Sequence, residues 1–165
     1  MAARFDIEKL SAKHDHSPFD CGSEPLNRYF TQQVTQDVRR RVAACFVAIT
    51  SAGGIAGYYT LASASVPLVD LPPETARRLP RYPSVPAVRM GRLAIDRQFK
   101  EQGLGASLLA DALTRALSSD IAAFALIVDA KDDVAATFYR HHGFIAFGDN
   151  PHALFLPLAT AKPLP

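Results

Sequence analysis

Two glycines separated by a single residue, Gly103 and Gly105, form the stretch of this sequence best suited to hold a phosphate. They follow the apolar run Leu93-Ala94-Ile95, and apolar residues recur behind them at helical spacing: Ala106, Leu109, Leu113 and Leu117. The glycines are therefore predicted to open a helix after a strand. A helix N-terminus offers unpaired N–H groups and the positive end of a dipole. Short glycine motifs are common, so a turn without a ligand is the simpler interpretation of the glycines alone.

The arginines are a second candidate for chemistry. The net charge is only +2, which does not by itself indicate a nucleic-acid ligand. One cluster is Arg39-Arg40-Arg41, and a second basic group lies in the middle of the chain: Arg77, Arg78, Arg81, Arg89, Arg92, Arg97 and Lys100. A solvated basic face and a set of phosphate contacts both explain this distribution. The first cluster has a further explanation, because cations suit a helix C-terminus.

Composition narrows the class of protein. A chain of 165 residues with 48% hydrophobic and 21% charged residues predicts one globular domain over 1–165. The longest apolar run, 121–128, is too short to span a membrane, and the first residues lack the apolar core of a secretory signal. Cys21 and Cys45 have no metal-binding spacing, which favours two free thiols and a cytoplasmic protein.

The elements that must position these residues follow from periodicity and turn signals, and they predict an α/β fold. Strands are expected at 5–10, 43–50, 55–63, 87–95, 121–128, 144–147 and 153–158. A first helix is expected to follow a Ser23 cap, with an inner face formed by Leu26, Phe30, Gln33 and Val34. Further helices are expected within 74–79, from Gly103 onward, and from Asp132 or Asp133 to Gly143. The run 121–128 is apolar on both faces, which suggests a strand parallel to 87–95. Gly91 suggests a bulge or a close backbone approach within its strand. A long proline-rich connector is expected over 66–86.

The histidines are predicted to lie outside the site. His14 and His16 fall in a polar loop and are read as solvated, while His141 and His142 suit the last turn of a helix. In that helix Val134 and Phe138 are expected to form the core stripe, which leaves Tyr139 on a neighbouring edge.

Gln102-Gly103-Leu104-Gly105 after a strand, followed by Val128-Asp129-Ala130 and Phe138-Tyr139, resembles the GNAT acetyltransferase superfamily. The resemblance implies a GNAT fold, with a central mixed, mostly antiparallel sheet, a splayed parallel strand pair and flanking helices. It also implies acetyl-CoA as the cofactor and Tyr139 as the general acid. The coenzyme-binding residues would be Leu93, Ala94, Ile95, Lys100, Gln102, Gly103, Leu104, Gly105, Ala106 and Phe138. Lys100 stands where the family usually has Arg or Gln.

Further segments resemble one branch, the acetyltransferase toxins of bacterial toxin–antitoxin modules of the TacT and AtaT kind. They are Phe19-Asp20-Cys21-Gly22, Gly57-Tyr58-Tyr59-Thr60-Leu61, Arg89-Met90-Gly91-Arg92-Leu93-Ala94 and Val128-Asp129-Ala130-Lys131-Asp132-Asp133. The resemblance implies acetylation of the amino acid on aminoacyl-tRNA, a block of translation, a ribbon-helix-helix antitoxin and a homodimer. Phosphate contacts then become the better explanation of the arginines, with tRNA contacts expected at Arg77, Arg78, Arg89 and Arg92.

The chemistry suits that acceptor, because an α-amino group titrates near 8 and needs no strong base. Two alternatives stay open. An enzyme that acetylates a small amine or a protein N-terminus predicts an acidic acceptor cleft, whereas the middle segment is basic. A non-catalytic acyl-CoA-binding module predicts coenzyme binding without turnover. A cysteine nucleophile is a weaker route, because Cys21 has no adjacent His or resolving Cys.

Overall fold

The computed structural model describes residues 5–161, which group into two compact units. The first unit is the chain up to Ala62 together with Gly91–Ala112, and the second is Ser63–Met90 together with the chain from Leu113. Three elements run through both units: β3 (Ile55–Pro67), β4 (Ser84–Ile95) and α4 (Leu104–Ser118). The single domain expected over 1–165 stays a prediction, and each unit is described by itself.

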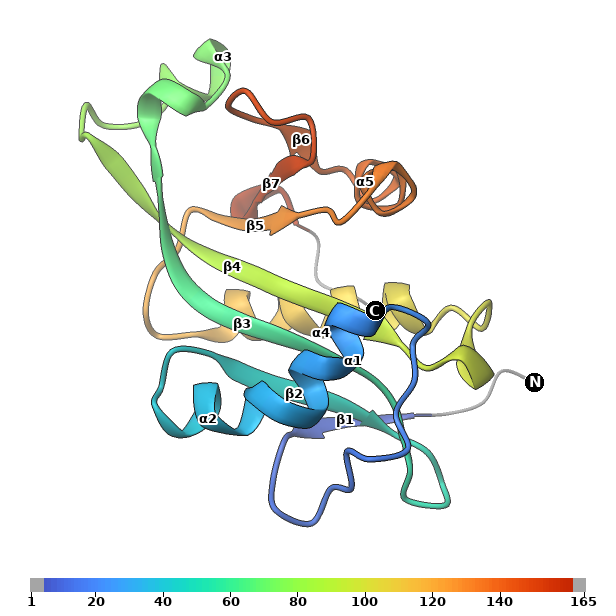
Figure 1. The fold of residues 1–165 in the computed structure, drawn as a ribbon. Helices are drawn as coiled ribbons and strands as arrows, with labels where there is room; N and C mark the ends of the chain where they lie inside the picture. Colours follow the sequence, from blue (N-terminus) through green and yellow to red (C-terminus); the bar gives the residue numbers. More distant parts are fainter. Residues whose placement is uncertain (1–4, 162–165) are drawn as a thin grey trace. The chain divides into compact units, whose positions relative to one another are not determined.

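The described residues form a seven-stranded sheet in the order β1-β2-β3-β4-β5-β7-β6 (Figure 1). Its other strands are β1 (Asp6–Lys9), β2 (Ala44–Ile49), β5 (Ala125–Asp129), β6 (Ile145–Ala146) and β7 (Ala153–Pro157). β4 and β5 run parallel, while the pairs β1/β2, β2/β3, β5/β7 and β6/β7 are antiparallel. The mixed sheet with one parallel pair, flanked by helices, confirms the predicted fold class.

In the first unit a broken helix packs against the antiparallel strands. It consists of α1 (Glu24–Arg28), a π-helical turn η1 (Tyr29–Gln33) and α2 (Val34–Arg39). Tyr58 and Tyr59, which follow one another on β3, point to opposite faces of the sheet because side chains alternate along a strand. The Tyr58 hydroxyl donates to the Leu26 carbonyl of α1 at 2.8 Å, and the Tyr59 hydroxyl donates to Asp111 of α4 at 2.5 Å. The two tyrosines thus join helices on both faces to the sheet.

Gly57 sets how closely α4 approaches this sheet. A Cβ at Gly57 would lie 2.9 Å from the Ala94 carbonyl oxygen and 3.0 Å from Leu108 Cδ1. Only glycine fits such an approach without displacing backbone. At Gly91 of β4 a Cβ would lie 3.1 Å from Thr60 Oγ1, so the close neighbour there is a side chain and not the expected backbone.

In the second unit β5 lies between β4 and β7, and all four residues Ala125–Val128 are buried. One core cluster joins Leu71, Val85, Ala125, Ile127 and Phe155. α5 (Asp133–His141) follows β5, and its cap is as predicted, because Asp132 Oδ1 accepts the Ala135 N–H at 2.8 Å. Gly143 follows α5 with φ +95°, which suits the predicted end of the helix.

Several predicted element bounds are wrong. β5 begins at Ala125 rather than 121, because the Ile121 N–H is taken by Ser119 Oγ in a local turn, and Ile121 is 83% exposed. The proline-rich connector is shorter than expected, because β3 continues to Pro67 and β4 begins at Ser84. Within it lie only η2 (Leu68–Asp70) and α3 (Pro73–Ala76). The remaining short helical turns are η3 (Arg97–Phe99) and η4 (Leu158–Thr160).

Two predicted helix faces also need correction. In α5 the buried residues are Ala136 and Tyr139, while Val134 is 81% exposed and Phe138 is half-buried. In α4 the buried face is Leu104, Leu108, Leu109, Ala112 and Ala116, and Leu117 points outward. Apolar residues occur on more than one side of each helix, so periodicity alone did not single out the buried face.

His14 was predicted to be solvated, and this prediction is wrong. His14 is buried, its Nδ1 accepts the Ser11 N–H at 2.9 Å, and its Nε2 lies 2.7 Å from Glu8 Oε1. His16 stacks on Phe30 with ring centroids 4.6 Å apart. Ser23 occupies the predicted cap position but makes no side-chain cap hydrogen bond, and Gln33 is exposed.

Both cysteines are free, as predicted, and both are buried. Among residues 5–161, the longest helices fall short of the length and apolar content needed to cross a membrane.

Candidate active site

The glycine loop opens α4, and its backbone amides are unoccupied. The Ser107 N–H donates to the Gly103 carbonyl at 3.1 Å, and within the described chain the amides from Gly103 to Ala106 have no acceptor. Gly103 has φ +78°, and a Cβ built there would meet nothing within 4 Å. Open space therefore lies beside free N–H groups at the positive end of a helix of 15 residues, which is what a bound phosphate requires.

The segment before the loop is held in place by hydrogen bonds and an ion pair to residues from the early part of the chain. Asp20 accepts the Asn27 side-chain amide and the Gly22 N–H through Oδ1, and its Oδ2 lies 3.1 Å from the Arg97 guanidinium. Buried Asp96 accepts the Asp20 N–H at 3.0 Å. These hydrogen bonds hold the pKa of Asp20 below its ordinary value, the largest cause being the Asn27 amide. The role of Asp20 was not predicted, although an Asp two residues before a glycine is the usual sequence signal of such a turn.

Lys100 belongs to the same set of contacts. Its Nζ donates to the Cys21 carbonyl at 2.8 Å, which leaves two of the three ammonium donors for another partner. Glu101, which has φ +63°, is exposed to solvent. Gln102 is also exposed, whereas Leu104 is buried and anchors the first turn of α4.

β4 offers open backbone next to this loop in sequence. Its pairing with β5 covers Ala87–Met90, but the strand continues to Ile95. The groups of Leu93-Ala94-Ile95 that face this edge thus have no strand partner among the described residues. Ala94 is buried and fixed in place, since the Asp96 N–H beside it donates to the Ala56 carbonyl at 2.8 Å.

Tyr139 lies in the second unit, with its ring in the core and its hydroxyl unpaired. The ring contacts Phe138 and Phe144, with centroids 5.2 and 5.4 Å away, and the residue is 6% exposed. No other described residue hydrogen-bonds the hydroxyl, and every solvent-excluded polar side-chain atom in residues 5–161 has a partner, so the hydroxyl must retain solvent contact. Burial raises the pKa of Tyr139 well above its ordinary value, so the phenol carries its proton throughout the neutral range. Such a group can donate a proton but cannot serve as a base near neutral pH.

The structure divides the four predicted tRNA arginines into two kinds. Arg77 and Arg78 are exposed, and neither side chain is paired within the described chain. Arg89 is instead paired with Asp129, and Arg92 places its guanidinium 3.5 Å from the centre of the Tyr29 ring. The latter two are therefore tied into local structure, which the sequence did not indicate.

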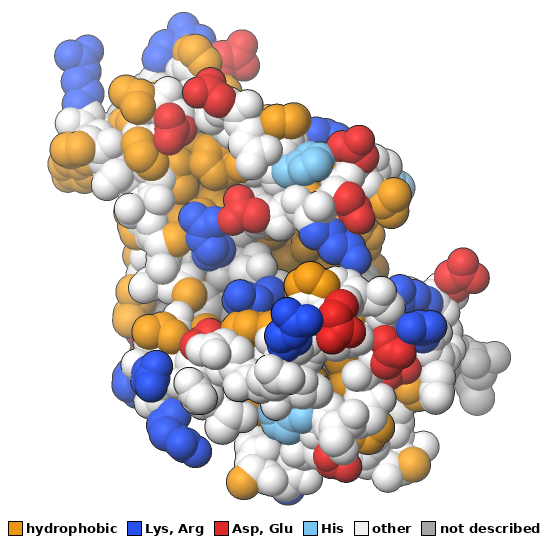
Figure 2. All heavy atoms as spheres, viewed as in Figure 1, with side chains coloured by type: hydrophobic (Ala, Val, Ile, Leu, Met, Phe, Trp, Pro, Cys, Tyr) orange, Lys and Arg blue, Asp and Glu red, His pale blue; other side chains and the backbone are white. Residues whose placement is uncertain are grey.

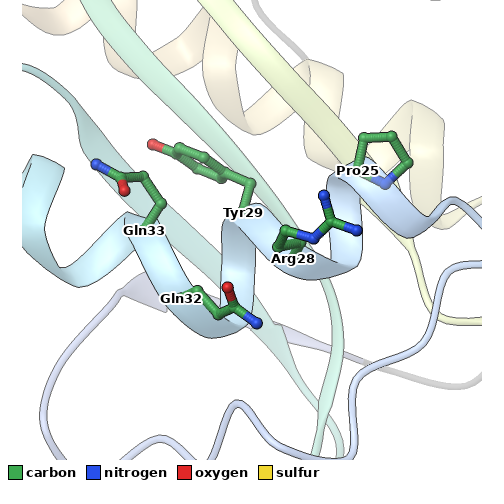
Figure 3. A pocket seen from close by; sticks show the side chains of 5 residues that line it. All are labelled: Pro25, Arg28, Tyr29, Gln32 and Gln33. Carbon is green, nitrogen blue, oxygen red and sulfur yellow. The ribbon is translucent and has the colours of Figure 1, made fainter.

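A pocket in the first unit lies beside this Tyr29. It has a volume of about 280 Å³ and is lined by Pro25, Arg28, Tyr29, Gln32 and Gln33 (Figure 3). The π-helical turn supplies three of these five residues, and such turns are frequent at functional sites. The Tyr29 hydroxyl donates to Asp37 at 2.8 Å, and Asp37 also accepts from Gln33. This pocket could not be predicted from the sequence, because no residue pattern distinguishes a π-turn from an ordinary helical turn.

The comparisons with known proteins agree over most of the chain. A family described as acetyltransferase (GNAT) domain matches residues 20–153. A tRNA-acetylating toxin of Mycobacterium tuberculosis is 32% identical over 158 residues, which is 94% of this chain and 93% of the relative.

Two solved structures are similar as well. AtaT complexed with acetyl-methionyl-tRNAfMet has a TM-score of 0.85 and 34% identity, covering 95% of this chain and 96% of that one. A tyrosine-to-phenylalanine mutant of the AtaT toxin, bound to the C-terminus of the antitoxin AtaR and acetyl-CoA, has a TM-score of 0.79 and 31% identity, covering 94% of both chains. On this evidence the chain belongs to the GNAT acetyltransferase family.

Proposed function

We propose that this protein is an acetyl-CoA-dependent toxin that acetylates the α-amino group of aminoacyl-tRNA and thereby blocks translation. The observation that carries the proposal is the similarity, over 95% of the chain, to AtaT in complex with acetyl-methionyl-tRNAfMet. The basic, unpaired Arg77 and Arg78 support a polyanionic acceptor over a small amine.

The free amides of the glycine loop fit the pyrophosphate of the coenzyme, and Lys100 retains donors for the same phosphates. The open edge of Leu93-Ala94-Ile95 would hydrogen-bond the pantetheine arm, as a strand does when it extends a sheet. An N–H near Leu93 or Ala94 would hold the acetyl oxygen. We propose coenzyme contacts also for Gln102, Leu104, Gly105 and Ala106 of the loop and, on the family resemblance, for the half-buried Phe138.

Acetyl-CoA supplies an activated thioester when bound. In the transfer, the neutral amine forms the C–N bond while the C–S bond breaks, and the amine gives its proton to water. We propose that Tyr139 donates a proton to the leaving sulfur and is reprotonated from solvent. Its raised pKa keeps it in the donating form throughout the neutral range, where the α-amino group already has a neutral fraction that can react.

We further propose a ribbon-helix-helix antitoxin and a homodimer as the assembly, on the toxin resemblance and on the AtaT structure with the antitoxin AtaR. Charged tRNA is a cytoplasmic substrate, so the proposed activity places the protein in the cytoplasm.

The test is to incubate the purified protein with labelled acetyl-CoA and total charged tRNA, and to identify the labelled species by tRNA and amino acid. We expect label on the aminoacyl group, lost when tRNA is deacylated beforehand, and little label with the Tyr139→Phe variant. Label on small amines or protein N-termini instead would support the first alternative. Coenzyme binding without label on any acceptor would support the non-catalytic alternative.

A further inference from the structure

The connection between β3 and β4 ends in an exposed, basic and aromatic surface, here called the hairpin tip (residues 68–83). Arg77, Arg78 and Arg81 are exposed on it, and Tyr82 is 64% exposed. Tyr82 is the only aromatic residue among the strongly exposed large hydrophobic side chains of residues 5–161. Figure 2 shows Lys and Arg side chains standing out above this end of the unit, with hydrophobic side chains below them.

The tip is held firmly despite its exposure. Its apolar side chains Leu68, Leu71, Ala76 and Leu79 pack on the core cluster of the second unit. The Leu68 N–H donates to the Pro83 carbonyl at 3.1 Å, which closes the base of the hairpin. The backbone at Tyr82 is restrained as well, because Pro83 follows it and the Tyr82 N–H donates to the Pro80 carbonyl at 2.8 Å. A backbone restrained in this way loses little conformational entropy when the residue binds a partner through its side chain.

The charges on the tip favour a polyanion over a protein surface. The three arginines follow α3 in the chain, and none forms an ion pair or hydrogen bond through its side chain within the described residues. The two carboxylates of the tip, Asp70 and Glu74, lie earlier in it and form no ion pair with these guanidinium groups among the described residues. Cationic side chains beside a rigid aromatic ring are the combination that binds unpaired nucleotides, because the cations meet phosphates while the ring stacks on a base.

We propose that Tyr82 stacks on an unpaired base of the tRNA substrate while Arg81, with Arg77 and Arg78, contacts the adjoining phosphates. This inference rests on the proposed function and adds a residue that binds the tRNA by stacking on a base. Stacking does not release counterions, so the Tyr82 contribution is independent of salt, unlike that of the arginines.

The experiment measures the Kd for total tRNA by fluorescence anisotropy at several salt concentrations, together with the KM for charged tRNA. Tyr82→Ala should raise both about 5–150-fold, the scale of one base–aromatic stack. The slope of log Kd against log salt and the affinity for acetyl-CoA should not change. Tyr82→Phe should resemble the wild type, since it keeps the ring. Arg81→Gln should instead flatten the slope by about 0.7.

Two control variants make the test sharp. Ile121→Ala removes an apolar side chain of the same unit that is even more exposed than Tyr82, and it should leave Kd unchanged. Tyr82→Leu keeps apolar surface without a ring and should behave like Tyr82→Ala. If Leu restores the affinity, or if Tyr82→Ala leaves tRNA binding unchanged but dissociates a dimer or an antitoxin complex, the stacking proposal is overturned.

The two proposals fail separately. If the wild type binds tRNA through Tyr82 but acetylates no charged tRNA, the proposed reaction is wrong and the surface stands. If it acetylates charged tRNA while Tyr82→Ala matches the wild type in Kd and KM, only the surface is wrong.

Discussion

The Tyr139 ring lies in the core of the second unit, while its hydroxyl has no partner in the described chain. Replacing Tyr139 with Phe removes only that hydroxyl, so the packing against Phe138 and Phe144 should survive. We expect Tyr139→Phe to lower kcat by about 10²–10⁴-fold, the usual contribution of a general acid. Acetyl-CoA affinity, measured by calorimetry, and thermal stability should stay near the wild-type values. An unchanged rate would remove Tyr139 from the mechanism.

Cys45 makes the stability of the folded protein depend on pH in the alkaline range. Its side chain is fully buried in β2, and burial raises the pKa of its thiol from 9.0 to about 12. In the unfolded chain the thiol ionises near 9, so between pH 9 and 12 the unfolded state loses a proton that the folded state keeps. The stabilisation is complete below pH 9 and is lost as the pH rises.

Urea unfolding at pH 8, 9 and 10 measures this effect. The free energy of unfolding should fall over this range, and it should fall less steeply in Cys45→Ala, even though the cavity destabilises that variant at every pH. Cys21→Ala is the matched control, since it removes the other thiol. A slope that is the same in Cys45→Ala and the wild type would contradict the assignment.

At the residue scale the sequence located Tyr139 correctly on α5 but reversed its packing with Phe138. Helical spacing reports which residues share a face, whereas burial of that face depends on the strands behind it. The same limit applies to His14, because its partner Glu8 belongs to a strand and the polar sequence around it gave no sign of burial.

At the glycine loop, substitutions can separate the effect of backbone strain from the effect of filling the space that the ligand would occupy. Gly103→Asp should abolish acetyl-CoA binding, because a carboxylate would occupy the open space beside the free amides. Gly105→Asp is expected to act in the same way. Binding is measured by calorimetry on folded protein.

Gly53 provides the matched control for this substitution. It has φ +90° in the turn between β2 and β3, and a Cβ there also meets nothing within 4 Å. Gly53→Asp therefore carries the same backbone strain without touching the loop, and should bind acetyl-CoA normally. Loss of binding in both variants would mean that strain, not the phosphate site, explains the result.

At the element scale the sequence predicted the order and type of the main elements, since β-branched runs, caps and the glycine loop are local signals. It did not predict the π-turn at Tyr29–Gln33 or the extension of β3 and β4 through a proline-rich region. Both depend on packing and on hairpin hydrogen bonds between residues distant in sequence.

At the scale of the whole molecule, Arg77 and Arg78 are the clearest probes of the acceptor, because Arg89 and Arg92 have partners within the protein. The double variant Arg77→Glu, Arg78→Glu should raise the KM for charged tRNA and flatten its dependence on salt. Acetyl-CoA affinity should be kept. Steady-state kinetics over a salt series measures this.

Glu74→Lys, on α3 just before these two arginines, is the control of opposite sign. It should lower the KM for charged tRNA. A flat salt response in the wild type, with a KM that neither variant changes, would favour a small-molecule acceptor over tRNA.

The place of β7 in the sheet bears on how truncated chains are interpreted. β7 is made after β6 but lies between β5 and β6, and it pairs with β5 along the whole of Ala125–Asp129. A chain cut after α5 would keep the glycine loop and Tyr139 yet leave β5 with one bare edge. Such a chain is expected to be inactive and prone to aggregate through that edge. A deletion series would thus assign an essential role to a C-terminal segment that carries none of the proposed catalytic residues.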